Sequence, residues 1–453
     1  MISGDKENDE RRSAIMTSDL FADFQARGLV HQSTEPNAIR AWLATGGRRI
    51  YAGFDPTADS LHVGHLVALM LLRRVAHAGH EPVALVGGAT GMIGDPSGRS
   101  EERNLLSPES LSNNVSCVER QIRAILEGTG QRVHVVNNGD WMRGVGYLEF
   151  LRDVGKHVPL SQMLAKDSVK SRLERNDPDS GLRGAGLSYT EFSYMLLQAW
   201  DFVHLLDSLD CRVQIGGSDQ WGNITAGIDL ARRLRATDVF GLTCPLLTKA
   251  DGTKMGKTAS GAIWLDPRRT SPYRFYQYWI NLDDNDAGRC LERLTEIPLE
   301  EVRGLETLRA THPAARDSQK RLADELTRLV HGEDGLASAR QATAIFFGAE
   351  IGGADGIAMD DALLAEIFAD VPSREFARTV LDGDGLLLIE AMEATGLATN
   401  RSHARRTIEQ GGASVNNRRI ADVAYRLTCQ DLSGTSSLVL RSGKKSYAIA
   451  RFK

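Results

Sequence analysis

Between about residues 48 and 247, short apolar runs alternate with longer helical stretches, and this alternation constrains the fold more than any other feature of the chain. The strand-like runs cover residues 49–54, 82–86, 133–136 and 212–215, and the helix-like segments cover residues 64–78, 114–126, 190–206 and 220–234. Strands that alternate with helices predict an α/β fold with a parallel sheet covered on both faces. Ligands of such sheets bind beyond the carboxyl ends of the strands, so residues that directly follow a strand are the first candidates for a site.

The pattern changes after residue 267. Residues 272–368 have helical spacing and are rich in Ala, Leu, Glu and Arg, which predicts an α-helical domain. A Gly- and Asp-rich stretch at 381–385 predicts a linker, followed by two short helices, turns and strands. The predicted organisation is a disordered N-terminal extension at 1–17, an α/β domain at 18–247, a loop and linker at 248–265, a helical domain at 266–380 and a small α+β domain at 386–453.

Composition and charge exclude several classes of protein. No apolar run approaches the length needed to span a bilayer, and the acidic first seventeen residues lack the apolar core of a secretory signal. Five scattered cysteines without CxxC spacing indicate reduced side chains in a cytoplasmic protein and no zinc site. The net charge is −5, but residues 401–453 carry eleven Lys or Arg and three Asp or Glu, a local charge of +8. This basic end favours a polyanionic partner, although a solvated basic surface explains the charge equally well.

Two histidines three residues apart, His62 and His65, follow the first predicted strand and a loop that contains Pro56. The first backbone N–H groups of a helix have no partner inside the helix, so a helix start attracts phosphate. Both rings would lie on one helix face and could donate to phosphate oxygens, and Gly64 between them lets a flat ligand approach the backbone. The start of an ordinary helix with two partly exposed histidines explains the same residues.

A second stretch, residues 247–258, places Lys254 and Lys257 in a Gly- and Thr-rich segment after the α/β region. This composition predicts a mobile loop, and loops that close over a substrate often complete an active site. Two ammonium groups could neutralise the charge that develops on a triphosphate during displacement at phosphorus. A solvated lysine loop between domains is the alternative.

The two stretches together resemble the paired signatures of class I aminoacyl-tRNA synthetases, His-x-Gly-His and Lys-Met-x-Lys-Ser/Thr. Val63 stands where that family usually has Ile, and Gly256 and Thr258 stand where it usually has Ser, so no histidine or lysine is lost. The runs YAGFDPTADSLHVGHL, ALVGGATGMIGDPSGR, YTEFSYMLLQAWDF and VQIGGSDQWGNI resemble bacterial tyrosyl-tRNA synthetases, and the likeness extends from about residue 21 to the C-terminus. This resemblance implies a Rossmann-like catalytic domain, a KMSKS-type loop, a helical anticodon-binding domain and an S4-like RNA-binding domain.

The resemblance implies a tyrosine pocket in which Tyr51 and Asp201 hold the substrate hydroxyl. Tyr194, Gln198 and Asp95 would surround the substrate ammonium. Tyr194, Gln198 and Asp201 are spaced i, i+4 and i+7 within one predicted helix, which puts them on one face, as a pocket wall requires. A buried hydroxyl left unpaired is costly, so a site built to pair it rejects phenylalanine.

The other site residues that the resemblance implies would serve ATP, which brings Mg²⁺ as part of the substrate, and no metal site of the protein is expected. The nucleotide would contact Gly53, Asp55, His62, His65, Gly217, Asp219, Gln220 and Lys257. The catalytic groups would be Thr57, His62, His65, Lys254, Lys257 and Thr258, and the departing pyrophosphate would meet Arg99 and Arg103. The family often has Lys at the position of Arg99, and a solvated charged loop is the alternative for both arginines.

Residues 399–416 resemble an S4-type RNA-binding domain, whose helix Asn400 or Ser402 can cap. The resemblance implies a homodimer with tRNA(Tyr) as its partner, bound through Arg401, Arg405, Arg406, Arg418 and Arg419. One stretch departs from the family. Residues 176–186 are rich in Gly, Pro and Asp and longer than expected, which predicts a surface insertion.

Two other functions are compatible with parts of the sequence. A nucleotidyltransferase with the same His-x-Gly-His fold that acts on a small metabolite would have no use for the helical and S4-like modules. Tryptophanyl enzymes share the catalytic fold but usually lack the S4 module. A non-catalytic RNA-binding protein derived from a synthetase would be expected to lose catalytic positions, whereas Tyr51, His62, His65, Lys254 and Asp201 are all present. The function that the resemblance implies is therefore that of a tyrosine–tRNA ligase.

Overall fold

The computed structural model describes residues 19–97, 106–166, 169–170, 188–250, 252–258, 261–347, 349–351, 359–369, 371–443 and 446–453. The chain forms two compact units. The first comprises Met1–Ser271 and Tyr278–Val330, and the second comprises Pro272–Gln277 and His331–Lys453. Within the described ranges, no helix combines the length and the apolar character needed to cross a bilayer.

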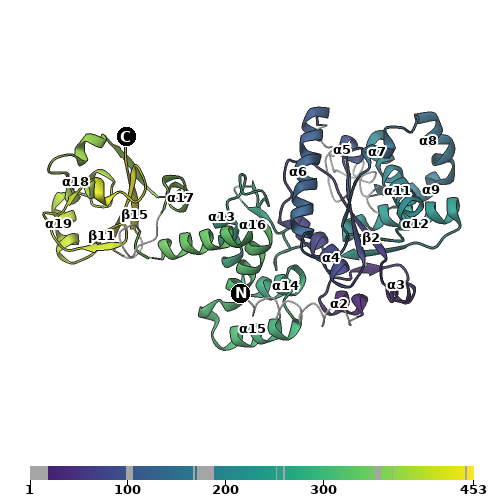
Figure 1. Cartoon of the computed structure of the whole chain (residues 1–453), viewed down its shortest axis with the longest axis horizontal. Coiled ribbons are helices and arrows are strands. Elements are labelled where there is room, and N and C mark those ends of the chain that lie inside the picture. The colour runs from purple at the N-terminus through teal and green to yellow at the C-terminus, as the bar shows by residue number, and fades with distance from the viewer. Residues whose placement is uncertain are drawn as a thin grey trace, which may run out of the picture. The chain divides into compact units, whose positions relative to one another are not determined.

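A six-stranded sheet forms the centre of the first unit (Figure 1). The strands are β1 Gln32–Ser33, β2 Arg49–Phe54, β3 Glu81–Val86, β4 His134–Asn137, β5 Val213–Gly217 and β6 Phe240–Cys244, in the spatial order β1-β6-β5-β2-β3-β4. Only β1 is antiparallel to its neighbour in this sheet. The predicted parallel sheet is confirmed. The short edge strand β1 and the Gly-containing strand β6 were not among the predicted runs.

Helices cover both faces of the sheet, as predicted (Figure 1). One face carries α4 Leu66–His77 and α6 Pro108–Leu126, and the other carries α11 Tyr189–Leu209 and α12 Trp221–Arg235. The predicted helix at 64–78 begins differently, because Val63–His65 forms the 3₁₀ turn η1 before α4 starts. The shorter helices of the α/β region are α2 Leu20–Ala26, α3 Pro36–Leu43, α5 Thr90–Ile93, α7 Gly139–Met142, α8 Tyr147–Asp153 and α9 Leu160–Leu164.

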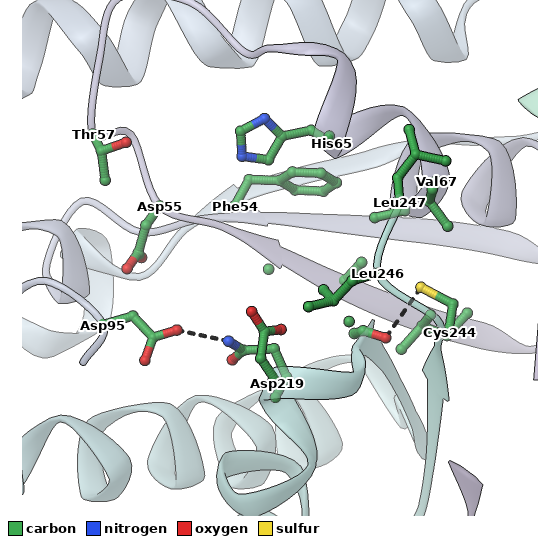
Figure 2. Close-up of a pocket in the computed structure, with 18 of the residues that line it drawn as sticks. Phe54, Asp55, Thr57, His65, Val67, Asp95, Asp219, Cys244, Leu246 and Leu247 are labelled. Atoms are coloured by element: carbon green, nitrogen blue, oxygen red, sulfur yellow. Dashed lines mark hydrogen bonds between the residues drawn. The ribbon is translucent and has the colours of Figure 1, made fainter. Parts of the chain in front are cut away.

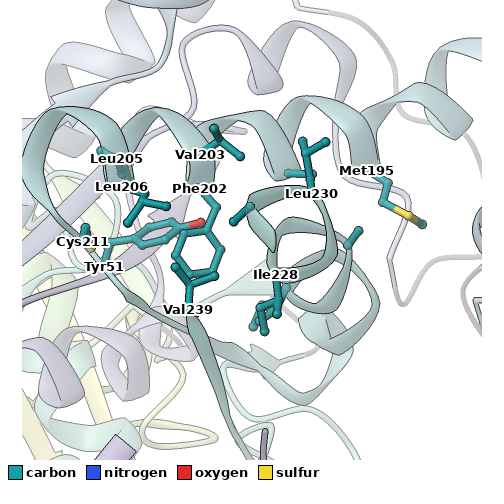
Figure 3. Close-up of a cluster of buried hydrophobic side chains, with 14 of the residues drawn as sticks. Tyr51, Met195, Phe202, Val203, Leu205, Leu206, Cys211, Ile228, Leu230 and Val239 are labelled. Carbon is teal, nitrogen blue, oxygen red and sulfur yellow. The ribbon is translucent and has the colours of Figure 1, made fainter. Parts of the chain in front are cut away.

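A hydrophobic core lies between the sheet and the pair α11 and α12 (Figure 3). Tyr51 of β2 is one of its largest members, and only 1% of its surface is exposed. Its ring meets Phe202 of α11 edge to face, with centroids 5.2 Å apart and planes at 71°, an arrangement that aromatic pairs prefer. The central strand is therefore fixed against α11 by the same side chain whose hydroxyl group was predicted to contact substrate.

Buried ion pairs fix the C-terminal end of α4 to the turn between α14 Asp284–Leu294 and α15 Leu299–Thr311. Arg74, which is 5% exposed, donates to Asp23 Oδ2 at 3.2 Å and to the carbonyl oxygen of Thr295. Arg73 pairs with Glu296 at 2.7 Å. Breaking one partner of a buried pair costs about 3–5 kcal/mol. The C-terminal end of the helix that follows the two histidines is thus fixed by ion pairs and hydrogen bonds.

The remaining helices confirm the helical region expected at 272–368. They are α13 Pro272–Ile280, α14, α15, α16 Asp317–Phe346 and α17 Asp361–Ile367. Gly332 interrupts α16 with φ 74° and ψ −179°, next to the point where the two units divide. A positive φ of this kind costs little only for glycine. The predicted domain boundaries at 247, 265, 380 and 386 stay a prediction.

The second unit ends in a small α+β region, as expected. Its five-stranded sheet has the order β12-β11-β14-β15-β9, and β10 pairs with β13. The elements are β9 Ser373–Phe376, β10 Leu386–Leu387, α18 Leu388–Ala394, α19 Arg401–Glu409, β11 Ala413–Val415, β12 Arg418–Ile420, β13 Arg426–Leu427, β14 Ser437–Ser442 and β15 Ser446–Phe452. Asn400 caps α19 by accepting from the His403 amide at 2.8 Å. The five cysteines are free, and all except Cys429 are buried.

Candidate active site

A cavity of about 700 Å³ opens at the carboxyl ends of β2 and β5 in the first unit (Figure 2). It brings together most of the site residues predicted from the sequence: Tyr51, Gly53, Asp55, Thr57, His62, His65, Asp95, Tyr194, Gln198, Asp201, Gly217, Asp219, Gln220 and Lys254. Arg99, Arg103 and the stretch 176–186 lie outside the described residues, as do the side chains of Lys257 and Thr258. The predicted roles of all these residues stay predictions, but the convergence of the described site residues on one cavity is a structural fact.

The Asp201 carboxylate lies at the closed end of this cavity and is 1% exposed. It accepts a hydrogen bond from Asn138 Nδ2 at 2.9 Å and another from Trp141 Nε1 at 2.9 Å. Burial raises the pKa of Asp201 to about 7, and the two hydrogen bonds act in the opposite direction. The sequence analysis missed Asn138 and Trp141. Their positions could have indicated them, because both lie within five residues of the end of the predicted strand at 133–136.

The Tyr51 hydroxyl is buried beside this carboxylate. It has no hydrogen-bond partner among the described residues. Burial, and then the charge of Asp201, raise the pKa of Tyr51 well above its ordinary value, so the group is a neutral donor and acceptor. A buried hydroxyl without a partner costs about 1–3 kcal/mol. The buried end of the cavity therefore offers a ligand two groups: the Tyr51 hydroxyl, which lacks a hydrogen-bond partner, and the Asp201 carboxylate, which can accept further hydrogen bonds.

A hydrogen-bond network links this end of the cavity to the loop after β2. Tyr194 Oη donates to Asp55 Oδ2 at 2.8 Å, and Thr90 Oγ1 donates to Asp55 Oδ1 at 2.8 Å. Asn138 Nδ2 in turn donates to Thr90 Oγ1 at 3.1 Å, which closes the path to Asp201. Burial is the main reason why the pKa of Tyr194 is raised well above its ordinary value. Thr90 was also missed, although it lies four residues after β3.

A second network lies across the cavity. Gln220 Nε2 donates to Asp95 Oδ2 at 2.6 Å (Figure 2), and Gln198 Nε2 approaches Gln220 Oε1 at 3.4 Å. The buried Gln198 Oε1 has no partner within the described part of the chain. Burial, and next the charge of Asp95, raise the pKa of Asp219. Neighbouring carboxylates attract a cation into the space between them.

Both histidines are held by the backbone of the turn η1. His62 Nδ1 accepts from the Gly64 amide at 3.1 Å, and His65 Nδ1 accepts from the His62 amide at 3.1 Å. An imidazole that accepts through Nδ1 carries its proton on Nε2, so each ring presents a donor on its other side. Burial, and then the neighbouring His62, lower the pKa of His65 to about 3, which keeps that ring neutral. Figure 2 shows the His65 ring directed into the cavity beside Phe54.

The loop that carries Lys254 lies against this turn. The Gly256 amide donates to the Tyr278 hydroxyl at 2.9 Å, and the Met255 amide donates to the Leu247 carbonyl at 2.8 Å. Gly256 has φ 81°, and a Cβ built on it would lie 2.3 Å from a methyl group of Val63. Two departures from the usual family motifs, Val63 and Gly256, are therefore in mutual contact. The loop continues into the hairpin of β7 Lys257–Thr258 and β8 Gly261–Ala262.

The five arginines predicted to bind RNA are exposed on the second unit. Arg401, Arg405 and Arg406 lie on α19, and Arg418 and Arg419 lie on β12. The Arg419 guanidinium donates to the Gln410 carbonyl, directly after the last turn of α19. This hydrogen bond joins β12 to the C-terminal end of α19, so the basic side chains of the two elements come from neighbouring parts of the unit. No group of three or more His, Cys, Asp or Glu side chains in the described ranges is arranged to hold a metal ion.

Comparison with known proteins identifies the class of protein to which this fold and cavity correspond. Residues 44–348 match the family described as tRNA synthetases class I (W and Y), and residues 364–450 match the C-terminal domain of tyrosine–tRNA ligases. A solved structure of a C-terminally truncated mitochondrial tyrosyl-tRNA synthetase from Aspergillus nidulans has a TM-score of 0.65 and 30% identity, and the match covers 77% of this chain and all of that one. The chain belongs to the class I tRNA synthetases.

Curated relatives show to which group within this family the chain belongs. The tyrosine–tRNA ligase of Rhodopirellula baltica is 55% identical over 438 residues, which cover 96% of this chain and 97% of that protein. The tyrosine–tRNA ligase of Roseiflexus castenholzii is 48% identical over 95% of this chain and 99% of that protein. Within the class I enzymes, the chain belongs to the tyrosine–tRNA ligases.

The contact between Gly256 and Val63 gives a prediction with a matched control. Replacing Gly256→Ala adds a methyl group where Val63 already lies, and it also forces alanine to a positive φ. Gly252→Ala imposes the same strain at φ 83°, but its new methyl group meets no atom within 4 Å. We expect Gly256→Ala to lower the tyrosine-dependent ATP–pyrophosphate exchange rate roughly tenfold or more below that of Gly252→Ala. Equal rates in the two variants would show that the loop does not need this contact.

Proposed function

We propose that this chain activates L-tyrosine with ATP to form tyrosyl-adenylate and pyrophosphate, and then transfers the tyrosyl group to the 3′ end of tRNA(Tyr). In the first step, an oxygen of the substrate carboxylate forms a bond to the α-phosphorus while the bond to the pyrophosphate oxygen breaks. In the second step, a ribose hydroxyl of the tRNA replaces AMP at the carbonyl carbon. No side chain needs to act as a covalent nucleophile, because positioning and electrostatics supply the rate.

The observation that carries this proposal is the pair of Tyr51 and Asp201 at the closed end of the cavity. A substrate phenol that donates to the Asp201 carboxylate and accepts from the Tyr51 hydroxyl would satisfy the polar atom that the protein leaves without a partner. Phenylalanine would leave the Tyr51 hydroxyl without a partner and make no hydrogen bond to Asp201. Tryptophan carries an N–H donor but no acceptor for Tyr51. Tyrosine is therefore the amino acid whose hydrogen-bonding groups match this end.

The rest of the amino acid would be held nearer the cavity mouth. The substrate ammonium would lie near Asp95, Tyr194 and Gln198, where the carboxylates attract a cation and the Gln198 carbonyl oxygen has no partner among described residues. The substrate carboxylate would then point toward η1 and the ATP phosphates. Asp55, which binds Tyr194, would lie between the two substrates.

ATP would occupy the side of the cavity formed by the carboxyl ends of β2 and β5. Gly53 is exposed in the central strand and a Cβ there would meet no atom within 4 Å, so the strand leaves space for a ligand. Gly217, Asp219 and Gln220 would hold the adenosine, and Asp219 can accept from a ribose hydroxyl.

The phosphates would be bound by groups from η1 and the lysine loop. The Nε2 donors of His62 and His65 would contact phosphate oxygens together with Thr57. Lys254, Lys257 and Thr258 would stabilise the charge that develops at the α-phosphate, and Arg99 and Arg103 would bind the leaving pyrophosphate. Mg²⁺ would enter as part of the ATP substrate.

The second unit would bind the tRNA. Five exposed arginines on α19 and β12 can contact phosphates, and the region 401–453 carries a local charge of +8. Such binding depends on charge neutralisation and weakens with salt. We place the reaction in the cytoplasm, where the tRNA substrate is available.

A homodimer is supported by an apolar surface on the first unit. The helix α8 has no buried residue, yet it carries exposed large apolar side chains, and others follow on α9 and at the start of α11. The surface comprises Tyr147, Leu148, Leu151, Leu160, Leu164 and Tyr189. Apolar patches of this kind mark protein interfaces. We propose that a second copy of this chain covers it.

The proposed function is tested by ATP–pyrophosphate exchange with each amino acid in turn. We expect exchange with tyrosine to be faster than exchange with phenylalanine or tryptophan by several orders of magnitude in kcat/KM, followed by charging of tRNA(Tyr) in the presence of ATP. Exchange with tryptophan in place of tyrosine would contradict the specificity. Absence of exchange with every amino acid would instead favour a non-catalytic RNA-binding protein.

The raised pKa of Asp201 predicts a pH dependence of tyrosine binding. The ionised carboxylate is the better acceptor for the substrate phenol, and it is present above a pKa of about 7 in the empty site. Affinity for tyrosine is therefore expected to be constant above about pH 8 and to fall by up to roughly tenfold per pH unit well below 7. Calorimetric titration from pH 5.5 to 8.5 measures this. Asp201→Asn should bind weakly and lose this part of the slope, and an unchanged slope in that variant would assign the titration to another group.

A further inference from the structure

The indole ring of Trp141 is held from two directions by one helix. Its Nε1 donates to Asp201 Oδ1 at 2.9 Å. Its face is covered by the imidazole of His204, with ring centroids 4.3 Å apart and planes at only 14°. Asp201 and His204 lie three residues apart on α11, so they project from the same side of the helix. The helix therefore contacts the indole at its polar edge and on its flat face.

We propose that His204 is a positioning residue for amino-acid selection: its ring fixes Trp141, and Trp141 fixes the Asp201 carboxylate that receives the substrate phenol. This inference rests on the proposed function, because it assigns a cause to the selectivity of that site. His204 lies outside the motifs that resemble the family, and it is not among the residues that line the cavity. It acts through another side chain and touches no substrate.

The local structure explains why Trp141 needs this support. Trp141 lies on α7, a helix of four residues in which Gly139 is the only buried one. Such a short helix constrains a large side chain weakly, since it buries little surface of its own. The indole must nevertheless keep its N–H aimed at Asp201, and a stacked ring restricts rotation about the side-chain bonds while leaving the N–H edge accessible. His204 supplies that ring from the more rigid, 21-residue helix α11.

The chemical state of His204 suits this role. Burial lowers the pKa of His204, and only Asp207, on the same helix, acts in the opposite direction. The imidazole is therefore neutral at the alkaline pH of an exchange assay, and it places no charge beside the Asp201 carboxylate. A flat, neutral ring of another residue type should then substitute for it.

Loss of the stack has a specific consequence. An indole that leaves its position removes one of the two donors that favour the ionised form of Asp201. The carboxylate then becomes a poorer and less well oriented acceptor for the phenol. Tyrosine loses affinity, whereas phenylalanine, which has no hydroxyl, is unaffected. The preference for tyrosine over phenylalanine therefore falls, while the rate of the reaction at phosphorus is unchanged.

The experiment compares His204→Ala with His204→Phe, which keeps a flat ring and cannot ionise. ATP–pyrophosphate exchange at pH 8 is measured for both variants with tyrosine and with phenylalanine. We expect His204→Ala to raise the KM for tyrosine roughly threefold to tenfold with little change in kcat, and to leave kcat/KM for phenylalanine within about twofold. His204→Phe should stay within about twofold of the unsubstituted chain for both amino acids.

A matched control uses another partly buried histidine. His134 on β4 pairs with Glu81 at 2.7 Å, and within the described part of the chain no side-chain hydrogen bond or ion pair joins it to Asp201, Asn138 or Trp141. His134→Ala should lower thermal stability without changing the ratio of tyrosine to phenylalanine. If His204→Ala behaves in the same way, with an unchanged ratio, His204 is merely structural and the proposal is overturned.

A second variant keeps the proposal testable if His204→Ala folds poorly. Trp141→Phe removes the N–H donor, so His204 has nothing left to position. We expect Trp141→Phe to reduce the preference for tyrosine, and the double variant Trp141→Phe with His204→Leu, which fills the space of the imidazole without a flat ring, to reduce it no further. A further loss in the double variant would overturn the proposed route through Trp141. Failure of the unsubstituted chain to exchange with tyrosine would contradict the proposed function itself, and that outcome is separate from an unchanged ratio in the variants.

Discussion

The burial of the Asp201 carboxylate is the constraint on which the rest of this site depends. A carboxylate with 1% exposure is costly to ionise, and the structure supplies Asn138 and Trp141 as donors to offset that cost. Asn138 also binds Thr90, and Thr90 binds Asp55, so the same network reaches the loop after β2. The geometry of this part of the cavity is in this sense a consequence of keeping one buried charge satisfied.

The fold brings these groups together because the carboxyl ends of parallel strands share one edge of the sheet. Thr90, Asn138 and Asp219 follow three different strands, Tyr51 lies within β2, and α11, which covers one face of the sheet, contributes Asp201. The turn η1 and the lysine loop complete the mouth of the cavity through the contact of Val63 with Gly256. In the proposed function, the part of the site on the sheet and α11 would recognise the amino acid, and the loop elements would face the phosphates.

The sequence predicted much of this arrangement. Periodicity alone located β2, β3, β4, β5 and the four large helices to within a few residues, because each is long enough to show its repeat. It missed β1, which has two residues, and the 3₁₀ turn before α4, whose histidines bind the backbone. The candidate site came from motif resemblance, and its described members converge on one cavity.

Residues that act through contacts distant in sequence could not be found in this way. Trp141 and Asp201 are sixty residues apart, and Tyr278 of α13 binds Gly256 in the lysine loop. Asn138 and Trp141 could have been suspected from their position after a strand, but nothing in a linear pattern indicates that His204 covers the indole. Such partners follow from packing, which depends on how the helices are placed on the sheet.

The central claim is that the Tyr51 hydroxyl and the Asp201 carboxylate select tyrosine by pairing its phenol. The most direct test is the ratio of kcat/KM for tyrosine to that for phenylalanine in Tyr51→Phe, which removes one buried oxygen atom and retains the packing against Phe202. We expect this ratio to be at least roughly tenfold smaller than in the unsubstituted chain. The change should come from a lower kcat/KM for tyrosine, with kcat/KM for phenylalanine unchanged or higher. An unchanged ratio would contradict this claim.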